Sequence, residues 1–454
     1  NNFDNTTNTV DTLSGMWCGT NNESIRKIID EIRSGKNGYL YGDIVNSKPV
    51  IVPHTSINNY HNKYNDLSYY DYTNSDIVRK RPTTVIAGSN DGMVHAFYAG
   101  EPKTLKIEGQ EYKGVYSNKD YNYKLGQELW AFIPYNALPY LQWSNIEGPK
   151  YHIPKINYNF TLIDASIGEQ GNANAGDDRT ADSWRTLLVG TMGFGGKKME
   201  VNNGTDNKTY SSSIFVLDVT NTVLNNGEQN NNKPTFMWEA QLPDNTLALS
   251  QPTVIKLGEK QKNGDWYVVV GSGPNDPKAD NFTESPKLYF FNLKNGELEN
   301  TIDMDSYSQY KAIGEIMEVD SNNDYTDDTL FFGTYDNETG SLYAATINGD
   351  ISSTEIQSLS GGTTGNTFEA PYFAKPTNTF DEKNNVWVYA ASGRLFSDDD
   401  MKPIVSENSI QDNSTKQYIL GLKFTPGNTD NANNNNVITI NSISSMNLYN
   451  ATGK

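Results

Sequence analysis

The chain has 454 residues, with 36 Lys and Arg against 55 Asp and Glu and a formal net charge of −19 at pH 7. This length suffices for one large domain or two to three smaller ones. Nucleic acid and anionic membrane surfaces repel such an acidic chain, which argues against both as direct partners, whereas cations suit it. No run approaches the ~18 consecutive apolar residues of a membrane-spanning helix, so none is predicted.

The opening decapeptide "NNFDNTTNTV" lacks the basic and apolar regions of a secretion signal. We therefore expect a mature or truncated piece whose export signal has been lost. The single cysteine, Cys18, excludes an internal disulfide framework. It is either a buried or incidental thiol, or it pairs with a missing segment or another subunit.

One stretch near the N-terminus predicts a helix, at about residues 22–35. In "NNESIRKIIDEIRSG", four isoleucines recur at i, i+3, i+4 and i+7 and form one apolar face. Asn22 is the predicted cap at the start of the helix and Gly35 at its end. We expect the whole segment 1–39 to pack on the main body or to link it to a missing upstream domain.

From residue 40 to residue 454 the pattern becomes that of a β protein. Short runs rich in Val, Ile, Tyr, Phe and Trp alternate with turns of Gly, Asn and Asp. One theme returns, in which a strand ends at a small-residue turn; the predicted turns fall at Gly88, Gly190, Gly271, Gly333 and, more loosely, Gly393.

Each repeat has about four strands, which is the content of one propeller blade of typically ~40–50 residues. The excess length lies in polar insertions such as 101–124, 171–183 and 200–210. Stacking such sheets radially buries both of their faces. The sequence therefore predicts an all-β, modified β-propeller of five to seven four-stranded blades, with weak blades in 40–80 or 397–450. An array of β-sandwiches is the alternative.

The residues offer little for catalysis. None of His54, His61, His95 and His152 pairs with another at zinc-ligand spacing, and a single cysteine argues against Zn or Fe–S sites. His95 lies on a predicted strand, where a hydrogen-bonded core histidine is expected. The blade-end tryptophan and the adjacent cysteine pair typical of quinoprotein dehydrogenases are missing. We therefore expect a protein that is not an enzyme.

The stretch "VDSNNDYTDDTLFFG" is the candidate metal site. Asp320, Asn322, Asp324 and Asp328 stand at positions 1, 3, 5 and 9 of EF-hand numbering, and the carbonyl of Thr326 stands at position 7. Alternate residues of a tight loop point inward, so these hard oxygen ligands can converge on one Ca²⁺ ion.

Two features of an EF-hand are missing from this loop. Position 6 is Tyr325 instead of glycine, and position 12 is Phe331 instead of a bidentate glutamate. Asp and Asn are abundant in the chain, so the pattern also arises easily by chance. The residues by themselves leave two readings open, a calcium loop and a polar turn.

Several motifs occur in an order that resembles one known family. They are "LYGDIVNSKPVIV" (40–52), "IAGSNDGMVHAF" (86–97), "GQELWAFIP" (126–134), "WRTLLVGTMGFGG" (184–196), "FVLDVT" (215–220) and "YAASGRLF" (389–396). Together they cover roughly residues 22 to 424. The set resembles the C-terminal domain of the PilY/PilC-type proteins, the tip-located adhesins of bacterial type IV pili.

The resemblance implies a modified β-propeller with a calcium loop of the form D-x-N-x-D-x-x-x-D, which Asp320, Asn322, Asp324 and Asp328 match position by position. The family usually follows this loop with "Y-x-G-D-x-x-G-x-L", where this chain has "FFGTYDNETGSLY". The departure inserts residues and puts the surroundings of the metal in doubt.

The resemblance also implies a function in pilus biogenesis and tip adhesion. Expected partners are minor pilins at the pilus tip and a host or abiotic surface ligand, after export through the periplasm and outer membrane to the cell surface. Calcium in the loop would bias pilus extension against retraction. Empty carboxylates repel one another, so we expect a loose loop without metal and an ordered one with it. The alternatives are a general surface-binding propeller with a purely structural calcium and a quinoprotein-like enzyme.

Overall fold

The computed structural model describes residues 6–17, 20–34, 42–118, 121, 123–143, 152–202, 207–220, 233–277, 282–308, 311–360, 369–396 and 418–424. Cys18 and Gly35 lie outside these residues, so the predictions on them stay open. The chain divides into two compact units. Unit 1 comprises 1–252 with 261–263 and 293–296, and unit 2 comprises 253–260, 264–292 and 297–454.

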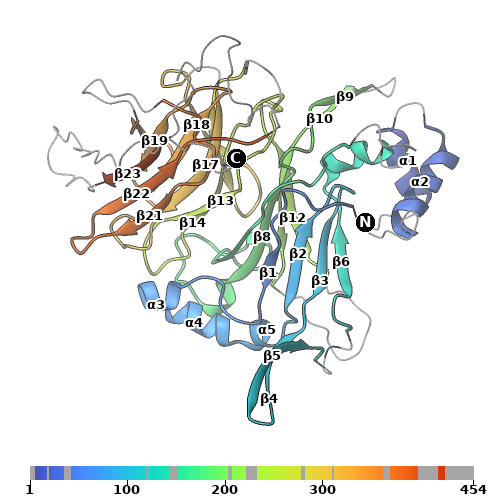
Figure 1. The fold of residues 1–454 in the computed structure, drawn as a ribbon, viewed down its shortest axis with the longest axis horizontal. Helices are drawn as coiled ribbons and strands as arrows, with labels where there is room; N and C mark the ends of the chain where they lie inside the picture. Colours follow the sequence, from blue (N-terminus) through green and yellow to red (C-terminus); the bar gives the residue numbers. More distant parts are fainter. Residues whose placement is uncertain are drawn as a thin grey trace, which may run out of the picture. The chain divides into compact units, whose positions relative to one another are not determined.

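Unit 1 contains two four-stranded antiparallel sheets (Figure 1). The first has the order β1-β2-β3-β6, built from β1 (Val50–Val52), β2 (Thr84–Gly88), β3 (Val94–Tyr98) and β6 (Glu128–Phe132). The second has the order β12-β11-β8-β7, built from β7 (Thr161–Ala165), β8 (Arg185–Thr191), β11 (Ser213–Asp218) and β12 (Thr235–Gln241).

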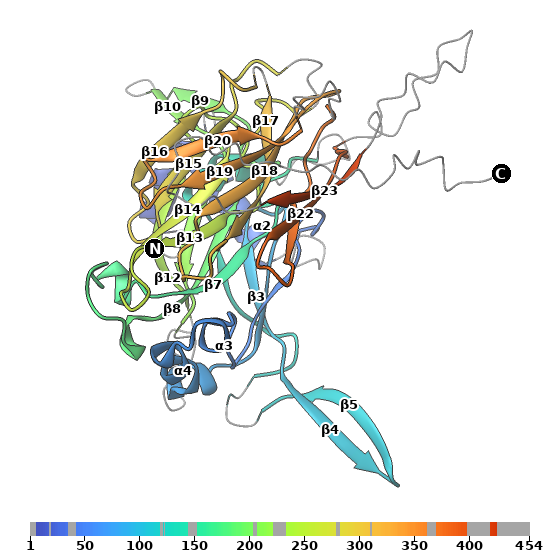
Figure 2. The same ribbon diagram turned by 90° about the vertical axis from the view of Figure 1, so that its left-hand side faces the viewer.

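Each sheet of unit 1 carries a separate hairpin inserted between two of its strands. Strands β4 (Glu101–Ile107) and β5 (Gln110–Tyr116) pair between β3 and β6, and Figure 2 shows this hairpin projecting away from its sheet. Strands β9 (Met199–Asn202) and β10 (Asn207–Tyr210) pair between β8 and β11. Both fall in segments predicted to be polar insertions, which therefore lie outside the sheets.

Unit 2 contains three further antiparallel sheets in which neighbours in space are neighbours in sequence. The first comprises β13 (Thr253–Leu257), β14 (Asp265–Gly271), β15 (Lys287–Asn292) and β16 (Leu298–Asp303). The second comprises β17 (Ala312–Val319), β18 (Thr329–Tyr335), β19 (Leu342–Ile347) and β20 (Thr354–Ser358). The third comprises β21 (Thr377–Phe380), β22 (Val386–Ala391) and β23 (Ile419–Phe424).

The prediction of an all-β chain built from blade-like sheets is confirmed. Four sheets have four strands and one has three within the described residues, which matches the lower end of the predicted five to seven. The predicted division into 1–39 and 40–454 stays a prediction. None of the helices in the described part of the chain is long and apolar enough to cross a membrane.

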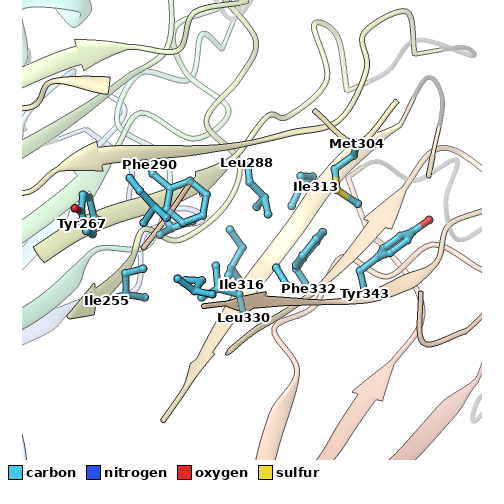
Figure 3. Close-up of a cluster of buried hydrophobic side chains, with 14 of the residues drawn as sticks. Ile255, Tyr267, Leu288, Phe290, Met304, Ile313, Ile316, Leu330, Phe332 and Tyr343 are labelled. Carbon is cyan, nitrogen blue, oxygen red and sulfur yellow. The ribbon is translucent and has the colours of Figure 1, made fainter. Parts of the chain in front are cut away.

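Strands β17, β18 and β19 of the second sheet of unit 2 are buried almost throughout, whereas its last strand, β20, is not. Leu330 and Phe332 of β18 join a cluster with residues of β13–β15 such as Phe290 (Figure 3), while Phe331 joins a second cluster with residues of β22 and β23. All seven residues of β18 are buried. This explains why "TLFFGTY" is a continuous apolar run without the alternation of a half-exposed strand.

Four of the five glycines predicted as turns lie in strands instead, and the fifth, Gly393, follows the end of β22. Gly88 and Gly271 end β2 and β14, and Gly333 lies inside β18. A Cβ added to Gly271 would lie 2.5 Å from the Ile313 side chain, and one on Gly333 would lie 2.2 Å from the Tyr372 carbonyl oxygen. In unit 2 the glycine recurs because the second strand of a sheet comes close to the chain that begins the next sheet.

Helix α2 (Asn22–Ser34) confirms the prediction from the isoleucine spacing. Its cap is Asn21 and not Asn22, since the Ser24 amide donates to Asn21 Oδ1 at 2.9 Å. A preceding helix, α1 (Thr7–Ser14), was not predicted. Trp17 follows it and donates from Nε1 to the Leu138 carbonyl at 2.9 Å, which anchors these helices on unit 1.

The segment 40–80 was expected to hide a blade and holds mostly helix besides β1. It contains α3 (Tyr60–Tyr64), α4 (Leu67–Asn74) and α5 (Asp76–Arg79). Tyrosines of α3 and α4 pack on Trp184, whose ring centroid lies 4.8 Å from that of Tyr69. Asp66, which caps α4, also forms a buried ion pair of 2.8 Å with Arg179. In 397–450, the other segment expected to hide a blade, only β23 lies within the described residues.

Candidate metal site

The candidate calcium loop connects β17 to β18 in unit 2. These strands pair antiparallel with Val319 opposite Thr329, so residues 320–328 form a nine-residue hairpin connection. These two strands are buried almost throughout, which gives the two ends of the loop a rigid base.

Side chains at alternate positions turn the first half of the loop around itself. The Asp320 carboxylate accepts the amides of Asp324 and Tyr325, both at 3.0 Å. Asn322 Oδ1 accepts the Asp324 amide at 2.9 Å, and Asp324 Oδ1 accepts the Thr326 amide at 2.9 Å. These hydrogen bonds hold loop positions 1, 3, 5 and 7 together, and the role of these residues as calcium ligands stays a prediction.

Tyr325 adopts the sharp turn for which EF-hand loops use glycine. Its φ is +79°, in the left-handed region that costs a non-glycine residue roughly 1–2 kcal/mol. The side chain is buried, and its ring lies over the ammonium of Lys256, with 5.0 Å from Nζ to the ring centroid. Packing therefore supports the turn, and the missing glycine does not prevent it.

Asp328 is held differently from the other predicted ligands. Its carboxylate accepts the Ser321 hydroxyl at 2.9 Å and the Thr329 hydroxyl at 2.8 Å. Burial is the main cause that raises the pKa of Asp328, and the nearby charge of Asp320 adds to it. The structure therefore gathers Asp320, Asn322, Asp324 and Thr326 and ties Asp328 to the base of the loop.

The donors of this loop have the chemistry that calcium prefers, which is carboxylate, amide and carbonyl oxygen. Among the residues that the structure describes, no three His, Cys, Asp or Glu side chains come together as a metal cage. A calcium ion here would be held by Asp320, Asn322 and Asp324 with the Thr326 carbonyl. A contribution from Asp328 requires it to exchange its hydroxyl partners for the metal.

Two residues outside the loop, Lys256 and Gly258, contact it and were not singled out from the sequence. The Asp327 carboxylate accepts the Lys256 amide and the Asp327 amide donates to the Lys256 carbonyl, both at 2.9 Å. The Thr326 hydroxyl donates to the Gly258 carbonyl at 3.0 Å. No local pattern could have found Lys256, because it lies on another sheet and far from the loop in sequence.

Unit 1 contains a second acidic site, centred on His95. Nδ1 of His95 lies 2.6 Å from Glu128 Oε1, and Nε2 lies 2.9 Å from Asp91 Oδ2. Burial opposes the charged imidazole, but these carboxylates outweigh it and raise the pKa of His95 to about 9. The prediction of a hydrogen-bonded core histidine is confirmed.

Two further basic side chains of unit 1 bond to residues around this site. Lys155 is buried and donates from Nζ to the Asn90 carbonyl at 2.9 Å, and burial lowers its pKa to about 8. His152 Nε2 lies 2.6 Å from Asp43 Oδ2. The motifs at 40–52 and 86–97 thus meet around a polar cluster that contains basic as well as acidic side chains.

Comparisons with known proteins agree with the family resemblance of these motifs. No family model matches the chain. It is 27% identical over 274 residues to a type IV pilus biogenesis factor PilY1 homolog of Xylella fastidiosa, an alignment that covers 58% of this chain and 16% of the relative. It is 26% identical over 274 residues to the type IV pilus biogenesis factor PilY1 of Pseudomonas aeruginosa, covering 59% of this chain and 17% of the relative. The alignments thus span about a sixth of the length of these relatives.

Among solved structures, the chain is similar to the C-terminal domain of Pseudomonas aeruginosa PilY1, with a TM-score of 0.52 and 18% identity. The match covers 84% of this chain and 64% of that one. At this identity the likeness shows the fold. The resemblance seen in the ordered motifs is confirmed: the chain is similar in sequence to PilY1 proteins and has the fold of a PilY1-type C-terminal domain.

Proposed function

We propose that the chain is a non-enzymatic domain of a type IV pilus biogenesis factor that acts at the cell surface, at the pilus tip. The observation that carries this is sequence similarity, over more than half of the chain, to proteins named as such factors. Minor pilins are the proposed partners on the pilus side, and a host or abiotic surface is the target of adhesion.

The loop 320–328 is the proposed regulatory site of this domain, with Ca²⁺ as its ligand. Hydrogen bonds support this, since Asp320, Asn322 and Asp324 hold the loop in the manner that alternate oxygen ligands require. Bound calcium would neutralise the carboxylates and stiffen the connection between β17 and β18. A stiffer loop would present a firmer surface to pilus components, which favours extension over retraction.

Titration calorimetry with Ca²⁺ on the intact chain tests the site. Wild type should bind one equivalent, and Asp324→Ala should bind at least about tenfold more weakly because a carboxylate ligand is lost. The matched control is Asp350→Ala, which removes an exposed aspartate from another turn of unit 2. Equal calcium binding by wild type and Asp324→Ala would contradict the assignment of the loop 320–328 as a calcium site.

Co-purification from a piliated cell tests the function separately. A tagged chain in its natural protein should bring down minor pilins, and its deletion should reduce surface pili. Retention of normal piliation and of surface attachment after deletion would contradict the proposal. Quinone absorbance in the purified protein would favour the quinoprotein-like alternative instead.

A further inference from the structure

A buried lysine lies against the inner side of the proposed calcium loop. Lys256, on β13 of unit 2, is 2% exposed. Its Nζ lies 3.5 Å from the Tyr325 carbonyl oxygen and 3.4 Å from the Glu259 carbonyl oxygen. The ring of Tyr325 adds a cation–π contact. Three partners of negative or partially negative character therefore surround this ammonium.

The backbone fixes this lysine to the loop from both sides. Asp327 exchanges two hydrogen bonds with the Lys256 main chain, each of 2.9 Å. Gly264 leaves the space that the side chain fills, since a Cβ there would lie 3.1 Å from Lys256 Nζ. The main chain of Lys256 is therefore tied to the loop, and its side chain is buried beside it.

We propose that Lys256 is an internal counter-cation of the loop, which keeps the loop folded without calcium and weakens its affinity for calcium. This rests on the proposed calcium site. The loop carries the four carboxylates of Asp320, Asp324, Asp327 and Asp328, and a positive charge 3.5 Å from the carbonyl of Tyr325 in the same loop offsets part of their mutual repulsion. The same charge repels an incoming divalent ion, and solvent screens a buried charge poorly.

The inference changes the expected behaviour of the empty loop. Repulsion among the carboxylates led us to expect a loose loop in the absence of metal. With Lys256 in place, the loop keeps its turn in the calcium-free protein, and calcium binds in the weak range of extracellular modules, roughly 10⁻⁴–10⁻³ M. The site would then respond to calcium outside the cell without unfolding when calcium falls.

Calorimetry on three full-length proteins tests this role: wild type, Lys256→Met and Lys260→Met. Lys256→Met keeps the apolar stem and removes the charge, and it should bind calcium about tenfold more tightly. Lys260 is exposed nearby, so its charge is screened and Lys260→Met should change the affinity less than about twofold. In calcium-free buffer, amide hydrogen exchange of 320–328 should be faster in Lys256→Met than in wild type.

The outcomes separate the two proposals. Calcium binding by wild type and Lys256→Met with the same affinity overturns the role of Lys256 and leaves the calcium site standing. Absence of binding in all three proteins overturns the calcium site and this inference with it. Should Lys256→Met fail to fold, Lys256→Gln, which keeps a hydrogen-bond donor without the charge, gives the same comparison.

Discussion

Two loops rich in Asp and Asn connect neighbouring strands of this protein, and they balance their charge differently. In unit 1, Asp91 in the β2–β3 connection is paired with the buried His95, and Lys155 bonds to the adjacent Asn90. In unit 2, Asp320 and Asp324 accept backbone amides in the β17–β18 connection.

The difference teaches which polar cluster is structural and which suits a metal. A carboxylate that meets a fixed imidazolium or ammonium is already neutralised, and its cation is part of the folded core. The loop 320–328 has four carboxylates within nine residues, and the ammonium placed against it is that of Lys256, 3.5 Å from the Tyr325 carbonyl oxygen. The β2–β3 connection has one aspartate, Asp91, with a histidine partner, whereas the loop 320–328 has four aspartates against the buried ammonium of Lys256, so the ratio of carboxylates to cations distinguishes the two loops.

The largest expected effect on stability follows from removing His95, the partner of Asp91 in the β2–β3 connection. His95→Leu leaves Asp91 and Glu128 facing each other without their shared partner, which should lower the free energy of unfolding of unit 1 by about 3–5 kcal/mol. Urea unfolding at pH 6.5 measures it. His61→Gln, at a half-buried histidine, is the control and should change stability by less than about 1 kcal/mol. A His95→Leu protein as stable as wild type would show that the pair is dispensable.

The pH dependence of stability should carry opposite contributions from two groups of unit 1. The folded pKa of His95, about 9, exceeds the ordinary 6.5, so its contribution is full below pH 6.5 and is lost as the pH rises to 9. The folded pKa of Lys155, about 8, lies below the ordinary 10.5, so its charged form is disfavoured and stability rises between pH 8 and 10.5.

The net prediction is a fall of about 2 kcal/mol in the free energy of unfolding between pH 6.5 and 8. It should change little from pH 8 to 9 and recover above pH 9, as urea unfolding at each pH would show. In His95→Leu the fall should vanish while the rise from Lys155 persists. A wild-type profile that is flat from pH 6.5 to 8 would refute the pairing of a charged His95 with the carboxylates.

The smallest expected effect on stability follows from weakening the hydrogen bonds that attach the loop 320–328 to Lys256. Asp327→Ala removes the acceptor of the Lys256 amide and should lower the free energy of unfolding of unit 2 by about 1–2 kcal/mol. Glu259→Ala, which truncates an exposed side chain in the β13–β14 connection close to Lys256 in sequence, should cost less than about 0.5 kcal/mol. Thermal unfolding in calcium-free buffer compares them. Equal stabilities would mean that the loop does not depend on this anchor.

Several features of the fold and the candidate site followed from local pattern. The isoleucine spacing predicted α2, because one helical face must be apolar to pack. The alternate Asp and Asn residues of the loop 320–328 were predicted as calcium ligands, which stays a prediction; in the structure they bond to amides two to five positions ahead. The strand runs predicted the sheets, although β18 is apolar throughout because both of its faces are buried.

What the sequence by itself determined is therefore the class of the protein and the repeating sheets, both of which depend on patterns along the chain. Only the tertiary structure decided that α3–α5 replace an expected blade, that the recurring glycines are contact points, and that Lys256 lies against the loop. These depend on residues far apart in sequence, such as Tyr69 with Trp184 and Lys256 with Tyr325. A contact of that kind has no local signature, because its energy comes from burial between elements that meet only once the chain has folded.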